Sequence, residues 1–525
     1  MRPSQRDYDD YNSNHRTVRV TRREMLWLAG LGALAGAEPA KAAPDGRITI
    51  GTHVSLAPIW FDPAETSGII TPFMVMYAMH DAMAKAMPGS AAEPCLAESW
   101  TMAADGLSYA FVLRPNVKFH NNEPVTAEDV KFSFERYRGA SHQLMKARVA
   151  SVETPDPLHV HFRLKAPWPD FLTFYTGASG AGWIVPKKYV EQVGEAGFKK
   201  APIGAGPYKF VSFTPGLELA CEAFEGYWRK VPAIKRLVFK VIPDEATRLA
   251  ALQRGEIDIA YSIRGELAEE LKRTPGLSIE AAVGSAPFWL YFPEQWDPRS
   301  PWHDQRVRQA VSLAIDRKAM NEALTLGHSH LTGSIFPENF EFYWQPPEPQ
   351  YDPGRAKKLL ADAGFANGFD AGDYNCDASY ANIGEVALNN LREVGVRVRL
   401  RPLERAAFFS AYSEKKLKNI VQGSSGAFGN AATRAEAFVA KGGTYAYGSY
   451  PDIDALFAEQ ASEMDRAKRT TLLHRLQQLV HERSIYAPIW QNALLSGVGR
   501  RVAQSGFGLI KGYPYTAPFE DLTLK

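Results

Sequence analysis

The sequence predicts an α/β protein with more than one domain. An apolar strand is expected at residues 237–242, then a helix that Asp244 caps and Gly255 ends, and a second strand from Ile257. A strand–helix–strand unit of this kind implies a parallel sheet. The chain has 525 residues, which is too long for a single hydrophobic core.

A second stretch, residues 94–136, combines a strand with a capped helix. Tyr109, Phe111 and Leu113 alternate with more polar neighbours, which is typical of a half-buried strand. Thr126 and Asp129 then have the spacing of a capping box at the start of a helix. The stretch therefore predicts a strand, a turn and an amphipathic helix.

The same reading predicts the other main elements. Strands are expected at 47–51, 159–164, 287–292, 396–400 and 417–422. Helices are expected at 71–87, 168–175, 304–320, 352–363, 385–393, 404–413, 453–457 and 469–482.

Composition excludes several classes of function. The 60 basic and 58 acidic residues give a net charge of +2, so the chain lacks the excess of positive charge that is typical of nucleic-acid-binding proteins. No nucleophile elbow, zinc-protease motif, P-loop or dinucleotide fingerprint is present, so we expect neither an enzyme nor a cofactor. Three separated cysteines leave at least one thiol free, and a single disulfide remains open. The 11 Trp, 22 Tyr and 28 Phe residues suit both core packing and stacking on a ligand.

The amino terminus has the pattern of an export signal. Arg22 and Arg23 precede a mildly apolar run at 25–37, and Ala40 and Ala42 occupy the two positions that a signal peptidase reads. The paired arginines indicate the twin-arginine route. The run is too short and too rich in Gly and Ala to anchor the chain in a bilayer. We therefore expect a mature periplasmic protein that starts near Ala43.

Three sequence segments carry a resemblance to a known family. They are "LAESW" with "PVTAEDVKFSFER" in the stretch 94–136, "DEATRLAALQRGEIDI" at 244–259 and "YDPGRAKKLLADAGF" at 351–365. Together they resemble the solute-binding proteins of peptide/nickel-type ABC importers, family 5. The resemblance implies a fold similar to type II periplasmic binding proteins, with two α/β lobes, an extra inserted domain and a hinge.

The resemblance also implies a domain layout and partners. Residues 1–42 would form a tail and signal peptide, 43–90, 201–286 and 488–525 domain I, 91–200 the inserted domain II, and 287–487 domain III. The protein would be a monomer that captures a small solute between its lobes and delivers it to an ABC permease with its ATPase subunits. A peptide-like solute is the first hypothesis; a nickel or metal-chelate carrier, or a carrier of oligosaccharides or opines, is the alternative.

The segment 423–434 departs from peptide-binding relatives. It carries no acidic residue between Lys418 and Glu436 to pair with a peptide ammonium group, and a buried ammonium without a counter-charge is costly. This departure argues against an ordinary oligopeptide that is held by its amine.

Candidate ligand-binding residues come from this segment and from two other loops. Within 423–434, Arg434 either holds a carboxylate or is a surface charge. Trp60 and Phe61 either lie beside the ligand or pack their own loop. The candidate set is Trp60, Phe61, Phe428, Asn430, Arg434 and Tyr445.

Two histidine pairs have a spacing that could suit a metal ion. His159 with His161 share one strand face, and His328 with His330 follow a glycine. A solvated strand face is the favoured interpretation of the first pair. The second pair has no adjacent acidic or cysteine partner, so loop positions are the favoured interpretation there.

Overall fold

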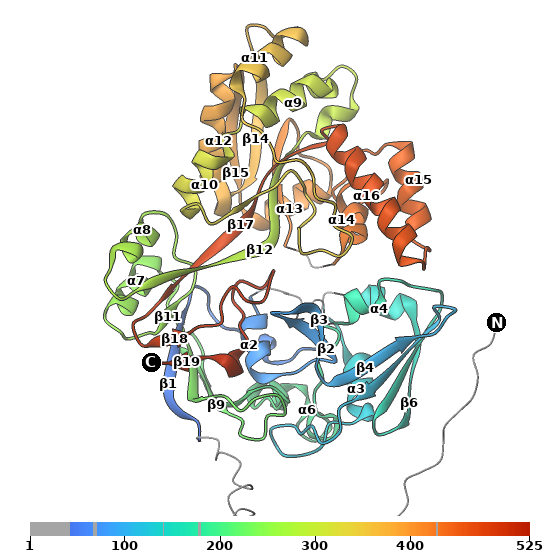
Figure 1. The fold of residues 1–525 in the computed structure, drawn as a ribbon, viewed down its shortest axis with the longest axis vertical. Coiled ribbons are helices and arrows are strands. Elements are labelled where there is room, and N and C mark those ends of the chain that lie inside the picture. Colours follow the sequence, from blue (N-terminus) through green and yellow to red (C-terminus); the bar gives the residue numbers. More distant parts are fainter. Residues whose placement is uncertain (1–42, 67–70, 140, 177–179, 427–428) are drawn as a thin grey trace, which may run out of the picture. The chain divides into compact units, whose positions relative to one another are not determined.

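The fold is given by a computed structural model, which describes residues 43–66, 71–139, 141–176, 180–426 and 429–525 (Figure 1). The export signal predicted at residues 1–42 lies outside the described residues. Within the described part of the chain, no helix is long and apolar enough to cross a bilayer.

One large sheet runs through both halves of the described chain. Among the described residues it has eleven strands, in the order β15-β14-β16-β12-β17-β11-β1-β10-β9-β8, with β13 paired to β17. Their bounds are β1 Asp45–Thr52, β8 Tyr208–Thr214, β9 Glu218–Ala223, β10 Ile234–Val241, β11 Ile259–Ala260, β12 Ser278–Tyr291, β13 His330–Leu331, β14 Phe369–Asp377, β15 Val396–Leu403, β16 Ile420–Ser424 and β17 Tyr486–Val498.

The first lobe comprises the strands β1 to β11, the helices up to and including the one that follows β11, and the segment after β17. Its small sheet has the order β4-β5-β7-β6, with bounds β4 Ala97–Met102, β5 Ser108–Leu113, β6 Val149–Asp156 and β7 His159–Leu164. Two short strand pairs add β2 Ala84–Met87 with β3 Ser90–Pro94, and β18 Val502–Gln504 with β19 Thr523–Leu524. The helices are α2 Phe73–Met79, α3 Ala127–Arg136, α4 His142–Arg148, α5 Phe171–Tyr175, α6 Lys187–Lys200, α7 Glu245–Gln253 and α8 Gly265–Arg273.

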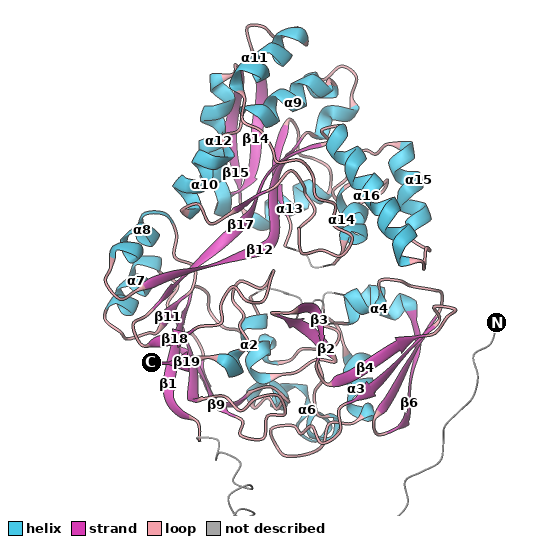
Figure 2. Ribbon diagram, viewed as in Figure 1, coloured by secondary structure: helices cyan, strands magenta, loops and turns pink. Residues whose placement is uncertain are grey.

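The second lobe comprises the elements between β12 and β17. Helices surround its strands in Figure 2. They are α9 Gln305–Ala314, α10 Arg317–Thr325, α11 Pro353–Asp362, α12 Ala381–Glu393, α13 Arg405–Ser413, α14 Ala431–Phe438, α15 Pro451–Gln460 and α16 Arg466–Glu482.

Strands β12 and β17 cross from one lobe to the other (Figure 1). They pair antiparallel from Ser278–Val498 at one end to Tyr291–Tyr486 at the other. The register shifts between Val283 and Pro287, where Pro287 has no N–H to donate to the ladder. The lobes are therefore joined by two paired strands with an irregular step in the middle.

The predicted parallel unit is confirmed. Strands β10 and β11 both pair parallel with β1, with Ile50 beside Phe239 on one side and Ile259 on the other. Helix α7 connects them, and Asp244 caps it by accepting a hydrogen bond from the Thr247 N–H at 2.8 Å. The capping box of Thr126 and Asp129 at the start of α3 is also present.

Two helix predictions were wrong in extent. The helix expected at 71–87 ends at Met79, because His80 turns extended and Ala84–Met87 pairs with β3. Pairing with a neighbouring strand overrides the helix propensity of this Ala- and Met-rich segment. The helix expected at 304–320 breaks at the extended Ile315, and Asp316 caps a new helix, α10.

The glycines of segment 202–210 have a packing role. A Cβ on Gly204 would lie 2.0 Å from the Met79 carbonyl oxygen, and one on Gly206 would lie 2.6 Å from the His80 nitrogen. Glycine is needed because this crossover packs directly against the end of α2. The three cysteines of the chain, Cys95, Cys221 and Cys376, are free and buried.

Candidate ligand-binding site

A cavity of about 740 Å³, called here the aromatic chamber, lies between the two lobes. Its floor is the crossing strands, through Phe288 of β12 and Asn492 and Leu494 of β17. The volume is within the range of pockets that bury a small-molecule ligand. Its aromatic lining residues are Phe288, Tyr380, Phe408, Phe409, Phe438, Tyr445 and Tyr515.

The aromatic rings of the second lobe form a packed wall. The rings of Phe438 and Tyr445 stack with centroids 4.9 Å apart, and Tyr445 also lies 4.9 Å from Tyr412. Phe288 meets Tyr380 edge to face at 4.9 Å. Burial raises the pKa of Tyr445, so its phenol stays neutral near pH 7. This wall offers a neutral, rigid surface for apolar or planar ligand groups.

One ion pair stands at the edge of this wall. Arg405 Nη1 donates to Asp377 Oδ2 at 2.6 Å, and the Arg405 guanidinium lies 5.2 Å from the centre of the Phe409 ring. Asp377 is 7% exposed, whereas Arg405 is 59% exposed. Within the described residues only Nη1 of Arg405 is engaged, which leaves donors for a ligand carboxylate.

His53 forms part of the chamber on the first lobe. Its ring lies 4.5 Å from that of Tyr515. Burial lowers the pKa of His53 to about 4, with further effect from the positive charges of Arg248 and Arg264. The imidazole is therefore neutral near pH 7, and its Nδ1 has no partner among the described residues.

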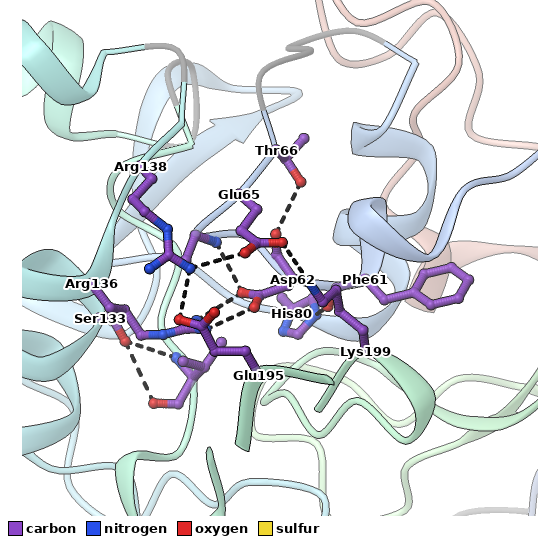
Figure 3. Close-up of polar contacts among 12 residues, drawn as sticks. Phe61, Asp62, Glu65, Thr66, His80, Ser133, Arg136, Arg138, Glu195 and Lys199 are labelled. Carbon is purple, nitrogen blue, oxygen red and sulfur yellow. Dashed lines mark hydrogen bonds and ion pairs between the residues drawn. The ribbon is translucent and has the colours of Figure 1, made fainter. Parts of the chain in front are cut away.

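The loop of Trp60 and Phe61 is held by a polar network, shown in Figure 3. Both Asp62 oxygens accept hydrogen bonds of 2.7 Å from Arg136, and His80 Nε2 donates to the Phe61 carbonyl at 3.1 Å. The Phe61 side chain is fully buried, 5.0 Å from the Phe213 ring, and Trp60 is half-buried against the same core. The structure therefore places both aromatic side chains outside the chamber lining, where they pack their loop.

Arg434, one of the candidates of segment 423–434, serves the structure of the second lobe. Arg434 is 2% exposed, and it donates to the carbonyls of Ile335 at 2.8 Å and Ser425 at 3.0 Å. Burial lowers its pKa to about 9. Phe428 lies outside the described residues. Of the predicted residues, Tyr445 lines the chamber; its role in binding remains a prediction.

Asn430 takes part in a contact between the lobes, called here the lobe bridge. Asp170, which precedes α5 of the first lobe, accepts two hydrogen bonds of 2.7 Å from Arg469 of α16. Asn430 Nδ2 donates to the same carboxylate, and Gln460 Oε1 accepts from Arg469 at 3.0 and 3.1 Å. The Arg469 side chain is 3% exposed and that of Asp170 is 13% exposed. The bridge is a largely desolvated charge pair that ties the small-sheet part of the first lobe to the second lobe.

Sequence reasoning missed Arg405 and Asp377. Each has a local signal: Asp377 ends a strand whose carboxyl edge faces the chamber, and Arg405 opens a helix with Phe408 and Phe409 one turn later. Both residues lie in segments that the prediction treated as ordinary scaffold. Among the described residues, no group of three or more His, Cys, Asp or Glu side chains is placed to hold a metal ion.

Two lobes, paired crossing strands and a chamber between them define a bilobal binding protein. The chain matches the family model described as "Bacterial extracellular solute-binding proteins, family 5 Middle" over residues 91–446, and it belongs to this family. The family binds solutes for ABC importers and is not enzymatic, so this protein is an extracytoplasmic solute-binding component.

Its relatives bind different solutes. The chain is 26% identical to the glutathione-binding protein GsiB of Pectobacterium atrosepticum, over 97% of this chain and all of that one. It is 29% identical to heme-binding protein A of Haemophilus influenzae, over 79% of this chain and 82% of that one. The structure of HbpA2 from Haemophilus parasuis matches with a TM-score of 0.75 and 25% identity, over 91% of this chain and all of that one. CtaP of Listeria monocytogenes shares the fold, with a TM-score of 0.79 and 22% identity, over 92% of this chain and all of that one.

Proposed function

We propose that this protein captures a peptide-like solute, a short peptide or an amino-acid conjugate with a free carboxylate, in the aromatic chamber. The observation that carries the proposal is the pairing of an aromatic wall with Arg405, whose remaining donors suit a carboxylate. Asp377 lines the same chamber and holds Arg405 in place through their ion pair, so that Arg405 presents its remaining donors to a ligand carboxylate. Relatives named for binding glutathione and dipeptides support this class of solute.

We further propose how the protein is exported and organised. It reaches the periplasm by the twin-arginine route, is cleaved near Ala43 and acts as a monomer with an ABC permease and its ATPases. Its domains follow the boundaries set out above, with domain I made of 43–90, 201–286 and 488–525. A variant with both Arg22 and Arg23 changed to Lys should remain in the cytoplasm, as cell fractionation would show.

Calorimetric titration tests the proposed solute. The probes are the dipeptide alanyl-phenylalanine, glutathione, mannopinic acid, Fe(III)-EDTA and heme. We expect the first two to bind, and Arg405→Ala to weaken them about 10- to 100-fold, since a hydrogen bond to a charged group contributes about 1.5–3 kcal/mol.

The matched control is Arg254→Ala. Arg254 is 58% exposed and pairs with Glu256 at 2.6 Å, which resembles the exposure and pairing of Arg405, but it does not line the chamber. Its loss should leave affinity unchanged. Binding of Fe(III)-EDTA or heme without any peptide would refute the proposal in favour of a chelate carrier. Unchanged peptide affinity in Arg405→Ala would remove Arg405 from the site.

A further inference from the structure

Strand β15 leaves one edge of the large sheet open (Figure 1). Among the described residues it pairs with β14 alone, in parallel, and it ends the strand order of the sheet. It is eight residues long, from Val396 to Leu403, and no other backbone group in the described part of the chain bonds to its outer edge. A free edge of this length presents a row of unpaired N–H and C=O groups, to which another strand can add.

The side chains of β15 divide between its two faces. The apolar ones pack in the core of the second lobe together with residues of α12; they are Val396, Val398 and Leu400. The positions between and after them carry three exposed arginines, Arg397, Arg399 and Arg401. Because side chains two apart in a strand share a face, the arginines form a row on the face of β15 that α12 does not cover.

This row holds more guanidinium groups than carboxylates to pair with them. Asp373 of β14 accepts a hydrogen bond from Arg399 at 3.2 Å and another from Arg401 at 2.8 Å. Those two arginines are still 72% and 59% exposed. The Arg397 side chain makes no hydrogen bond or ion pair among the described residues. Its register partner Asp370 accepts instead from a backbone N–H of its own strand, at 2.9 Å.

A lysine-rich loop adds to the positive charge. Asn375 of β14 lies on the same face as Asp373, and its Nδ2 donates to the Lys418 carbonyl at 2.9 Å, which holds the loop that leads into β16 beside this face. The loop carries three exposed lysines, Lys415, Lys416 and Lys418. These lysines and the arginine row are called here the basic edge. None of its residues lines the aromatic chamber.

We propose that the basic edge binds an extended acidic segment of a partner protein, which adds to β15 as a further strand. Carboxylates at alternate positions of the added strand would lie directly opposite the three arginines, where opposite charges stabilise the pairing. The same charges disfavour a second copy of this chain, since two β15 edges would bring arginine against arginine. The backbone edge therefore selects an extended segment, and the arginine row selects acidic side chains at every second position.

A capped peptide, acetyl-Thr-Glu-Val-Glu-Val-Glu-Thr-amide, tests the proposal by calorimetric titration at low salt. Its blocked ends lack the free carboxylate that the aromatic chamber is proposed to hold. We expect a Kd of about 100 µM or tighter, and slower hydrogen exchange of the β15 amides in the complex. A peptide of the same composition with its three Glu residues consecutive should bind at least about tenfold more weakly, because its carboxylates no longer match the row.

Protein variants test the arginine row. The combined substitutions Arg397→Ser, Arg399→Ser and Arg401→Ser should weaken the alternating peptide about tenfold or more, since three opposite-charge pairs are lost. The control removes three arginines elsewhere that are 49%, 58% and 79% exposed and likewise pair with carboxylates: Arg163→Ser, Arg254→Ser and Arg273→Ser. The control should keep the affinity of the unchanged protein.

Modified peptides test the strand pairing without altering the protein. Alternate amides of an added strand point toward β15, so N-methylation of one alternate set should abolish binding, and N-methylation of the other set should preserve it. Equal effects of the two methylations would overturn the proposal.

Three other outcomes would also overturn it. They are absence of binding at about 1 mM peptide, equal affinity for the alternating and consecutive peptides, and unchanged affinity in the triple variant of the basic edge, with thermal unfolding showing that variant folded. Vesicles of anionic phospholipid are a separate probe. Binding to them that the triple variant loses, without any binding of the peptide, would replace the acidic strand with a membrane surface.

Discussion

The lobe bridge predicts how strongly closure depends on one carboxylate. In Asp170→Ala, Arg469 loses two hydrogen bonds of 2.7 Å and its only acidic partner in the bridge, and it keeps Gln460. Breaking a fully buried pair costs about 3–5 kcal/mol. Opening of the lobes would hydrate Arg469 and relieve this cost. We therefore expect Asp170→Ala to destabilise the closed state relative to the open state by about 1.5–3 kcal/mol.

This loss should change both conformation and affinity. A penalty of that size on the closed state weakens a ligand that binds between closed lobes about 10- to 100-fold. Small-angle X-ray scattering should show a larger radius of gyration for Asp170→Ala, and calorimetry should show the weaker affinity. Asp156→Ala is the control, since Asp156 is exposed and pairs with His159 inside the small sheet.

A double-mutant cycle with Arg469→Ala checks the assignment. The two changes together should cost clearly less than the sum of each alone, because both remove the same contact. Additive effects within about 0.5 kcal/mol, or unchanged scattering and affinity in Asp170→Ala, would refute the reasoning.

Two further predictions concern stability. Burial lowers the pKa of the fully buried His80 from 6.5 to about 4. As the pH falls, the unfolded state therefore takes up the proton before the folded state does. The contribution of His80 to the free energy of unfolding is fully present above pH 6.5 and is lost progressively toward pH 4. Between pH 7 and pH 5, protonation of His80 in the unfolded state should lower the free energy of unfolding by about 2 kcal/mol. In His80→Gln, chemical denaturation should show a decline of the free energy of unfolding that is smaller by this amount. Equal declines in the two proteins would contradict the assignment. Arg434→Ala should lower the free energy of unfolding by about 3 kcal/mol, since two charge-assisted hydrogen bonds to carbonyls are lost; a loss below about 1 kcal/mol would argue against a structural role.

Local signals in the sequence were enough to place most elements. Asp244 and the pair Thr126 with Asp129 each cap a helix as their spacing predicted, because capping depends on residues within one turn. In the segment 71–87, local signals did not predict where the helix ends. Its composition favours a helix, but β3 and the glycine crossover at 204–206 decide that the chain leaves the helix after Met79.

The chamber was less predictable than the fold. Its wall combines His53, Asp377, Arg405, Tyr445 and Tyr515, which are far apart in the chain. Nothing in a single sequence states which of these distant side chains share a cavity. Family resemblance pointed instead to whole segments, and such segments also contain residues like Arg434 that hold the lobe together.

The crossing strands constrain how the solute specificity of this protein can diverge in evolution. The floor of the chamber proposed for the solute consists of Gly284, Ala286 and Phe288 of β12 and Asn492 and Leu494 of β17. The irregular step of the same ladder lies at Val283–Pro287. We therefore expect a substitution on this floor to change both solute affinity and the movement between the lobes. The residues of the second lobe that form the chamber walls line the chamber but do not join the lobes. We expect solute specificity to diverge mainly through these walls, while the floor preserves the movement between the lobes that releases the solute.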